Sequence, residues 1–284
     1  MRNQPLSFRY SVYLGAIGIL TLLITVLRSI ALCTAFDPIT GYFSTGALPI
    51  IIYIVEILAL IAAFAPLLLI KQEELDAQRA PLSLAGLAAA VAAALALIAT
   101  AIYLPLRVLS AIKQTATLPA PGPLMILSAA VLLLAAGYFL LHFLGKPQIA
   151  PLLGYAVILA AVLLLSITYF DRYTPMNAPH KISLHLSMLS IMLFMLYEIA
   201  AAVGRARPRV LSVASAICFT VTASTGISNL IGFAAGKGSD PLYLMGDLIA
   251  LTVAFYVAAR AVGDLLHAVK NTSPAKADDK EENT

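Results

Sequence analysis

Charged residues are scarce in this chain, and tryptophan is absent. Asp, Glu, Lys and Arg make up 11% of the 284 residues, whereas a soluble domain usually carries about 25%. Hydrophobic residues reach 61%, so most of the protein surface does not meet water and a soluble globular protein is excluded. Without tryptophan, an aromatic belt at a membrane interface has to be built from tyrosine.

Cysteine and histidine are too sparse for the common disulfide and metal frameworks. Cys33 and Cys218 lie far apart within apolar stretches, where cysteine is typical of small buried hydrophobic residues. The four histidines have no metal-ligand spacing, and the sequence has no His-Glu-x-x-His, Gly-x-Ser-x-Gly or Walker motif. We therefore expect no catalytic centre, no metal site and no cofactor.

Long hydrophobic runs are what the sequence has in abundance. A hydrocarbon core of about 30 Å needs about 20 apolar residues in a helix, and lipid forces each segment to satisfy its own backbone hydrogen bonds. The alternating pattern of a β-barrel is absent. We predict an all-α polytopic transmembrane bundle over residues 1–269, with eight spans at 11–34, 45–70, 83–104, 124–144, 150–170, 183–203, 210–233 and 241–267.

The segments between and after the spans are short or polar. The longest loop, 105–123, carries apolar residues with two basic ones between them, which predicts a short interfacial helix on the outer face. Residues 270–284 are polar and charged without an apolar period, which predicts a disordered cytoplasmic tail.

The formal charge of +4 does not indicate a nucleic-acid partner. Basic residues stand singly in short loops and form no stripe or patch. Lys and Arg collect in cytoplasmic loops of membrane proteins, so their distribution predicts orientation. With the N-terminus inside, eleven of them lie on the inner side and five on the outer side. We predict that both termini are cytoplasmic.

The two halves of the chain share a short pattern. Phe-Asp-x-x-Thr occurs at 36–40 after the first span and at 170–174 after the fifth, and the next span in each half carries a glutamate, Glu56 or Glu198. Four spans per half predict a 4+4 parallel repeat about an axis along the membrane normal. The alternative is coincidence, since the spacing from aspartate to glutamate differs between the halves.

Ionisable residues inside the spans are the default candidates for function, because each costs about 2.5–3.5 kcal/mol at mid-helix on insertion scales. Arg260 and Asp264 stand four residues apart, which favours a structural pair. Glu198 has no obvious partner beyond the basic cluster that follows its helix. The full set is Arg28, Glu56, Glu198, Asp247, Arg260 and Asp264.

Arg28 and Glu56 fall at similar depth in consecutive antiparallel spans. We predict that they pair. The pair is either a structural contact that fixes helix packing or part of a site that binds a charged solute or a coupling ion.

The seventh span, 210–233, is unusually polar. Its small hydroxyl residues favour close helix packing with hydrogen bonds across the contact. The alternative is that this span lines a hydrated cavity, with Asn229 and Asp247 near the outer mouth. The two polar stripes consist of Thr222, Thr225 and Asn229, and of Thr220, Ser224 and Ser228.

A third group of candidates lies at the outer mouth, before the sixth span. Asp171, Asn177 and Lys181 surround two prolines there. Pro179 restricts the residue before it and favours a rigid helix entry, with the lysine reaching the interface. The alternative is a loop that faces a ligand.

Some short strings are similar to a group of uncharacterised multi-pass membrane proteins of bacteria. They are Tyr169-Phe170-Asp171, Pro175-Met176-Asn177, Leu193-Phe194, Tyr197-Glu198 and the turn Asp37-Pro38-x-Thr40-Gly41-Tyr42-Phe43. The resemblance implies a location in the bacterial plasma membrane and no known activity.

These features together predict a bundle without an enzymatic centre. We expect small-solute or ion transport, or ligand sensing, through a central polar site. The alternative is a membrane scaffold or regulatory subunit whose interior charges are structural. The expected partners are the lipid bilayer and other membrane subunits or further copies of the chain. A cavity at the membrane charges favours the first function, and a closed, packed interior favours the second.

Overall fold

The computed structural model is an all-α bundle of eight spans over the residues that it describes, and the predicted fold class is confirmed. It describes residues 6–37, 40–44, 46–69, 81–115, 117, 119, 121–146, 148–171, 174–175, 177–205, 207–237 and 240–272. The helices are α1 (Leu6–Thr34), α2 (Ala47–Ala63), α3 (Ala65–Leu69), α4 (Leu84–Thr115), α5 (Gly122–Phe143), α6 (Ala150–Tyr169), α7 (Pro179–Ala202), α8 (Pro208–Gly232) and α9 (Pro241–Thr272).

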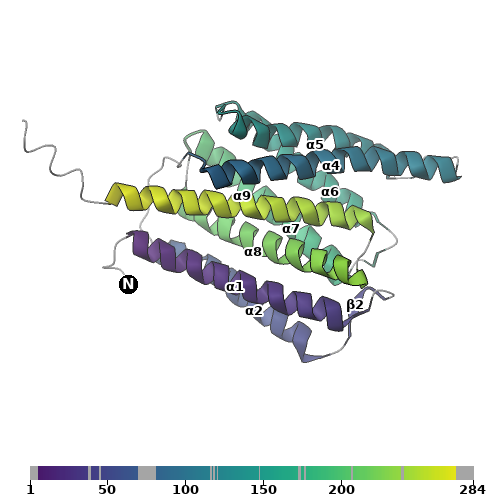
Figure 1. Cartoon of the computed structure of the whole chain (residues 1–284), viewed down its shortest axis with the longest axis horizontal. Helices are drawn as coiled ribbons and strands as arrows, with labels where there is room; N and C mark the ends of the chain where they lie inside the picture. The colour runs from purple at the N-terminus through teal and green to yellow at the C-terminus, as the bar shows by residue number, and fades with distance from the viewer. Residues whose placement is uncertain are drawn as a thin grey trace, which may run out of the picture.

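The described residues also form three further short elements. Strands β1 (Phe36–Asp37) and β2 (Tyr42–Phe43) pair as an antiparallel hairpin after α1, and a single π turn, η2 (Phe233–Lys237), follows α8. Helices α2 and α3 together make the second span. Because the spans alternate in direction, α1 begins and α9 ends at the same end of the bundle (Figure 1). This end, predicted to be cytoplasmic, is called the inner end below.

Helices α4 to α9 form a closed ring. Each packs against the next in the chain, and α9 packs back against α4. Helices α1 and α2 lie outside this ring, where α1 packs along α8 (Figure 1). The ring explains why α8 is the most buried span, since it has neighbours both inside and outside the ring.

Helix α8 packs through its small polar residues. The hydroxyls of Thr21 on α1 and Thr220 on α8 lie 3.1 Å apart. About two turns further along α8, the Ser228 hydroxyl donates to the carbonyl oxygen of Thr25 at 3.1 Å. The seventh span therefore makes the close packing that its composition favoured, with hydrogen bonds across the contact.

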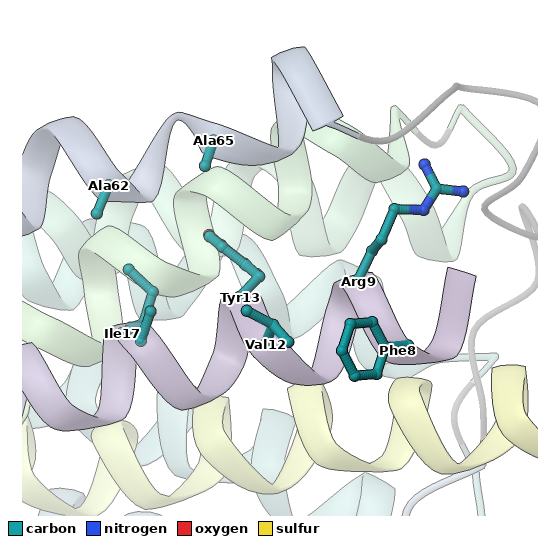
Figure 2. Close-up of a pocket in the computed structure, with 8 residues that line it drawn as sticks. Phe8, Arg9, Val12, Tyr13, Ile17, Ala62 and Ala65 are labelled. Carbon is teal, nitrogen blue, oxygen red and sulfur yellow. The ribbon is translucent and has the colours of Figure 1, made fainter. Parts of the chain in front are cut away.

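The second span is broken near Pro66, and a tyrosine of α1 hydrogen-bonds to a backbone carbonyl at the break. Proline has no N–H and clashes with the carbonyl four residues earlier, and α2 ends at Ala63. The Tyr13 hydroxyl, with one hydrogen to share, lies 3.2 Å from the carbonyl oxygen of Ala63 and 3.4 Å from that of Ser212 on α8. In Figure 2 the Tyr13 side chain extends from α1 toward the span that carries Ala62 and Ala65.

Two predicted boundaries are wrong. Residues 105–115 do not form a separate interfacial helix but continue α4, with Pro105 inside it. Transmembrane helices tolerate such a proline because neighbouring groups satisfy the freed backbone. At the other end of the chain, α9 continues to Thr272, so 270–272 belong to the helix. The rest of the predicted disordered tail, 273–284, lies outside the described residues.

The packing gives no support to the predicted 4+4 repeat. In that repeat α2 and α4 correspond to α7 and α8. Helix α7 packs closely on α8, whereas α2 and α4 are not a packed pair in the described part of the chain. Glu56 lies in the outer half of its span, while Glu198 lies in the last two turns of α7. The two glutamates are therefore at different depths.

Gly226 marks the closest approach of α8 to α9. A Cβ atom at this position would lie 2.9 Å from the Leu251 Cβ and 3.0 Å from the Asp247 carbonyl oxygen. We predict that Gly226→Ala destabilises the protein by about 1–3 kcal/mol, because the added methyl group overpacks a contact that includes backbone. Unfolding at increasing temperature or detergent strength measures the effect.

Gly15→Ala is the matched control, because nothing lies within 4 Å of a Cβ atom at that position. This variant should be as stable as the unaltered protein or more stable by up to about 1 kcal/mol, since alanine is more favourable than glycine within a helix. Equal stability of the two variants would contradict the packing of α8 on α9.

Candidate functional site

The ionisable candidates of the spans gather in two places. At the outer end, five side chains from five helices form what we call the outer polar network: Arg28, Glu56, His180, Asn229 and Asp247. Toward the inner end, Glu198 and Arg260 line a cavity inside the ring of helices. The predicted site residues are divided between these two places and the outer loop before α7.

The predicted pairing of Arg28 with Glu56 is confirmed. The Arg28 Nη1 donates to Glu56 Oε1 at 3.2 Å, from α1 to α2. The side chains are 13% and 28% exposed. Because each charge alone is costly in lipid, the pair fixes the position of α2, which lies outside the ring of helices.

Asp247 is the most enclosed carboxylate of the network. Its residue is 1% exposed. Asn229 Nδ2 donates to Asp247 Oδ1 at 2.9 Å, and His180 Nε2 lies 3.4 Å from Asp247 Oδ2. The alternative that Asn229 and Asp247 line a wet outer mouth does not fit this enclosure. His180 is a site residue that the sequence reasoning missed, although its place beside Lys181 at the start of α7 was a signal.

Lys181 and Asp171 hold the outer loop in place. The Lys181 ammonium group donates to the carbonyl oxygens of Tyr169, Asp171 and Thr174 at 2.9–3.3 Å, and so satisfies the carboxyl end of α6. The Asp171 carboxylate accepts a 2.9 Å bond from the Tyr243 hydroxyl. These contacts favour a rigid entry into α7. The third predicted residue of the loop, Asn177, is exposed.

A second ion pair at the outer end was not predicted. Arg107 on α4 binds Asp240, just before α9, through both guanidinium NH₂ groups, with Nη2 2.6 Å from Oδ2. Asp240 also accepts the N–H of Leu242 at 2.8 Å. Partial burial raises the pKa of Asp240, but these hydrogen bonds and the nearby positive charge lower it more, and the net pKa lies below the usual value.

The inner cavity has a volume of about 570 Å³. It is partly open and is lined by the start of α4 with the residues before it, the end of α5 with the loop that follows, the start of α6, the end of α7 and α9. Polar groups on its wall stand among apolar ones and include Gln148 and His142. The lining residues are Pro81, Leu82, Leu87, Tyr138, His142, Phe143, Gly145, Gln148, Pro151, Glu198, Ile199, Ala201, Ala202 and Arg260.

An ion pair between α7 and α9 lies in the wall of this cavity. Arg260 Nε and Nη2 both donate to Glu198 Oε1, at 3.2 and 3.1 Å. The Glu198 and Arg260 residues are 3% and 9% exposed. Arg260 was predicted to pair with Asp264, and the two charges do interact. The hydrogen bonds of Arg260, however, are to Glu198 on another helix.

A smaller apolar groove lies on the other side of the molecule, between α1 and the broken second span (Figure 2). Its volume is about 140 Å³, and Arg9 lies at the end nearest the start of α1. Apart from Arg9 and the Tyr13 hydroxyl its lining is hydrocarbon, so it offers a solute few polar contacts. The lining residues are Phe8, Arg9, Val12, Tyr13, Ala16, Ile17, Ala62 and Ala65.

The described residues contain no cluster of three or more His, Cys, Asp or Glu side chains that can hold a metal ion. Cys218 is buried as predicted, but Cys33 is exposed near the outer end of α1. The prediction for Cys33 is wrong because its helix lies at the edge of the bundle, with one side open to lipid.

The fold defines the class: this chain is a multi-pass α-helical membrane protein. Comparison with known proteins found no matching family model, no matching curated protein and no matching solved structure. The resemblance to uncharacterised bacterial membrane proteins therefore stays a prediction, and function has to be argued from the geometry.

The Arg107–Asp240 pair predicts a pH-dependent contribution to stability. The pKa of Asp240 is depressed in the folded protein, so its contribution is present above the unfolded value of about 4 and is lost as pH falls through the folded pKa. At neutral pH, Asp240→Asn should cost about 1 kcal/mol, because a pair about one-third exposed is screened by solvent. Comparing the unfolding of both proteins from pH 7 to pH 3 measures the effect.

Arg107→Gln should lower stability by a similar amount, and the double variant should cost much less than the two single changes added together. A stability difference that stays constant down to pH 3 would show that the ionised carboxylate contributes nothing.

Proposed function

We propose that this protein binds a small polar solute in the inner cavity and carries it across the membrane. The observation that supports this proposal is the position of the Glu198–Arg260 pair. Two buried charges stand in the wall of a cavity of about 570 Å³. Ligand sites commonly measure about 300–1,000 Å³ and combine apolar walls with a few placed polar groups.

The two ends of the bundle differ in a way that suits a carrier. The inner end is hollow around the Glu198–Arg260 pair. At the outer end, polar contacts join α1 to α2, α4 to the start of α9, and α9 to both α7 and α8. Carriers work by opening a central site to one side at a time. A hollow inner half below a closed outer half matches the inward-facing stage of such a cycle.

The charges of the cavity indicate the class of solute. Arg260 and Glu198 together are neutral, so a solute with a net charge would leave an uncompensated charge in a medium of low dielectric constant. A zwitterion can present its anionic group to the guanidinium and its cationic group to the carboxylate. Tyr138, His142 and Gln148 add hydrogen-bonding groups on the wall. We infer a small zwitterionic solute, of the size of an amino acid.

The scaffold alternative has one observation in its favour. Both glutamates of the spans, Glu56 and Glu198, are already paired with arginines. Closed pairs of this kind also serve to fix the positions of helices, which is all that a membrane scaffold or regulatory subunit requires. The cavity beside Glu198 is what the scaffold function leaves unexplained.

Removing both charges of the cavity tests the proposed function. Glu198→Gln alone leaves Arg260 buried without its anion, which typically costs about 3–5 kcal/mol in proteins. The double change Glu198→Gln with Arg260→Met removes both charges and should recover much of that stability. Thermal unfolding in lipid nanodiscs is then measured with a panel of zwitterionic, cationic, anionic and neutral solutes.

The unaltered protein should be stabilised by at least one zwitterion, by about 2.7 kcal/mol at 100 times its dissociation constant. The double variant should lose this stabilisation. The matched control, Arg28→Met with Glu56→Gln, removes an ion pair away from the cavity and should keep it. Uptake into proteoliposomes then separates a carrier from a sensor. Failure of the whole panel to stabilise the protein, or equal stabilisation of the double variant, would favour the scaffold.

A further inference from the structure

The charges of the outer polar network do not balance. The network holds two carboxylates, Glu56 and Asp247, and a single guanidinium, Arg28, which interacts electrostatically with Asp247 and His180 as well as with Glu56. An excess negative charge is costly in a medium of low dielectric constant. One added positive charge makes the network neutral.

Among the described residues, two cations of the outer end already face carboxylates of their own. On α4, Arg107 is matched by Asp240, and on α7 the Lys181 charge is matched by Asp171. The printed contacts of Asp247 bring His180 from α7 and the uncharged Asn229 from α8 to this carboxylate, and the Tyr243 ring of α9 packs against His180.

We propose that Asp247, together with His180 and Asn229, is a binding site for one proton. His180 Nε2 lies 3.4 Å from Asp247 Oδ2. The Asp247 carboxyl group holds the proton, and its O–H is accepted either by the neutral His180 ring nitrogen beside Oδ2 or by the Asn229 amide oxygen beside Oδ1. The protonated carboxyl group leaves the network neutral. The His180 ring also packs edge-on against the Tyr243 ring, at 5.0 Å between centroids.

Asn229 is suited to both protonation states of Asp247. Its Nδ2 donates to the carboxylate at 2.9 Å, as an ionised acid requires. Its Oδ1 is buried and has no hydrogen-bond partner, and the residue is 4% exposed. When Asp247 is protonated, a half-turn of the amide presents Oδ1 to the acid O–H. The unsatisfied oxygen is therefore explained as the acceptor for the protonated state.

A sodium ion would supply the same charge, and the chemistry of the site favours the proton. Hard cations take several oxygen ligands. One of the two Asp247 oxygens instead faces a histidine nitrogen, which can accept a proton.

The inference deepens the proposed function, on which its role in transport rests, by naming the proton as the coupling ion. Asp247 contacts α7 through His180 and α8 through Asn229. Binding or release of the proton changes both contacts. These contacts help to close the outer half, so the protonation state is coupled to opening at that end.

The test measures proton binding in the absence of any solute. Infrared difference spectra of the protein in nanodiscs, with isotopically labelled aspartate, are recorded between acidic and alkaline pH. The unaltered protein should show the C=O band of one protonated aspartate that titrates, and Asp247→Asn should lack this band. Glu56→Gln removes one negative charge from the network, so the same band should titrate at a pH at least one unit lower.

Glu56→Gln keeps Asp247 and so remains informative if Asp247→Asn fails to fold. Asp37→Asn, in the β1–β2 hairpin, is the control and should leave the Asp247 band unchanged. Absence of a titrating aspartate band, or an unshifted band in Glu56→Gln, would overturn the proposal. So would a carboxylate band that responds to sodium at constant pH with no acid band at any pH. Because no solute is present, failure of the inner cavity to bind one would leave these results unchanged.

Discussion

A charge in the hydrocarbon core has to find a partner on a neighbouring span, because lipid offers it neither water nor hydrogen bonds. This constraint ties the helices of the present bundle together. Arg28 joins α1 to α2, Arg260 joins α9 to α7, and Asp247 joins α9 to both α7 and α8. Helix α9 takes part in most of these contacts. The same requirement places these polar groups between helices and away from lipid.

Hydropathy alone predicted the eight spans, since a length of apolar helix sufficient to cross the bilayer depends only on local sequence. The departures involve contacts between helices, which hydropathy does not measure. The continuation of α4 past Pro105 places Arg107 beside Asp240, which comes 133 residues later in the chain. The break before Pro66 is stabilised by Tyr13 from another helix. Such contacts become visible only when the spans are packed.

In the candidate site, too, some contacts could be predicted from the sequence and others depend on how distant helices pack. The Arg28–Glu56 pair was predictable because consecutive antiparallel spans place the two residues at similar depth. Glu198 and Arg260 are 62 residues apart, and the whole of α8 lies between them in the chain. Their pairing depends on the contact of α7 with α9 in the ring of helices. His180 stands beside Lys181 at the start of α7, but it was not singled out because a lone histidine has no spacing that points to a partner on another helix. The inner cavity likewise arises from how five helices meet at one end.

The proposed carrier requires a hollow inner half and a closed outer half, and thiol labelling tests this contrast most directly. A single cysteine is introduced as Ala201→Cys in the cavity wall or as Ser228→Cys in the buried contact between α8 and α1, after replacement of Cys33 and Cys218. A membrane-impermeant thiol reagent should label Ala201→Cys from the cytoplasmic side alone, and Ser228→Cys should resist it from both sides. Labelling of Ala201→Cys from the outer side, or rapid labelling of Ser228→Cys, would contradict the account.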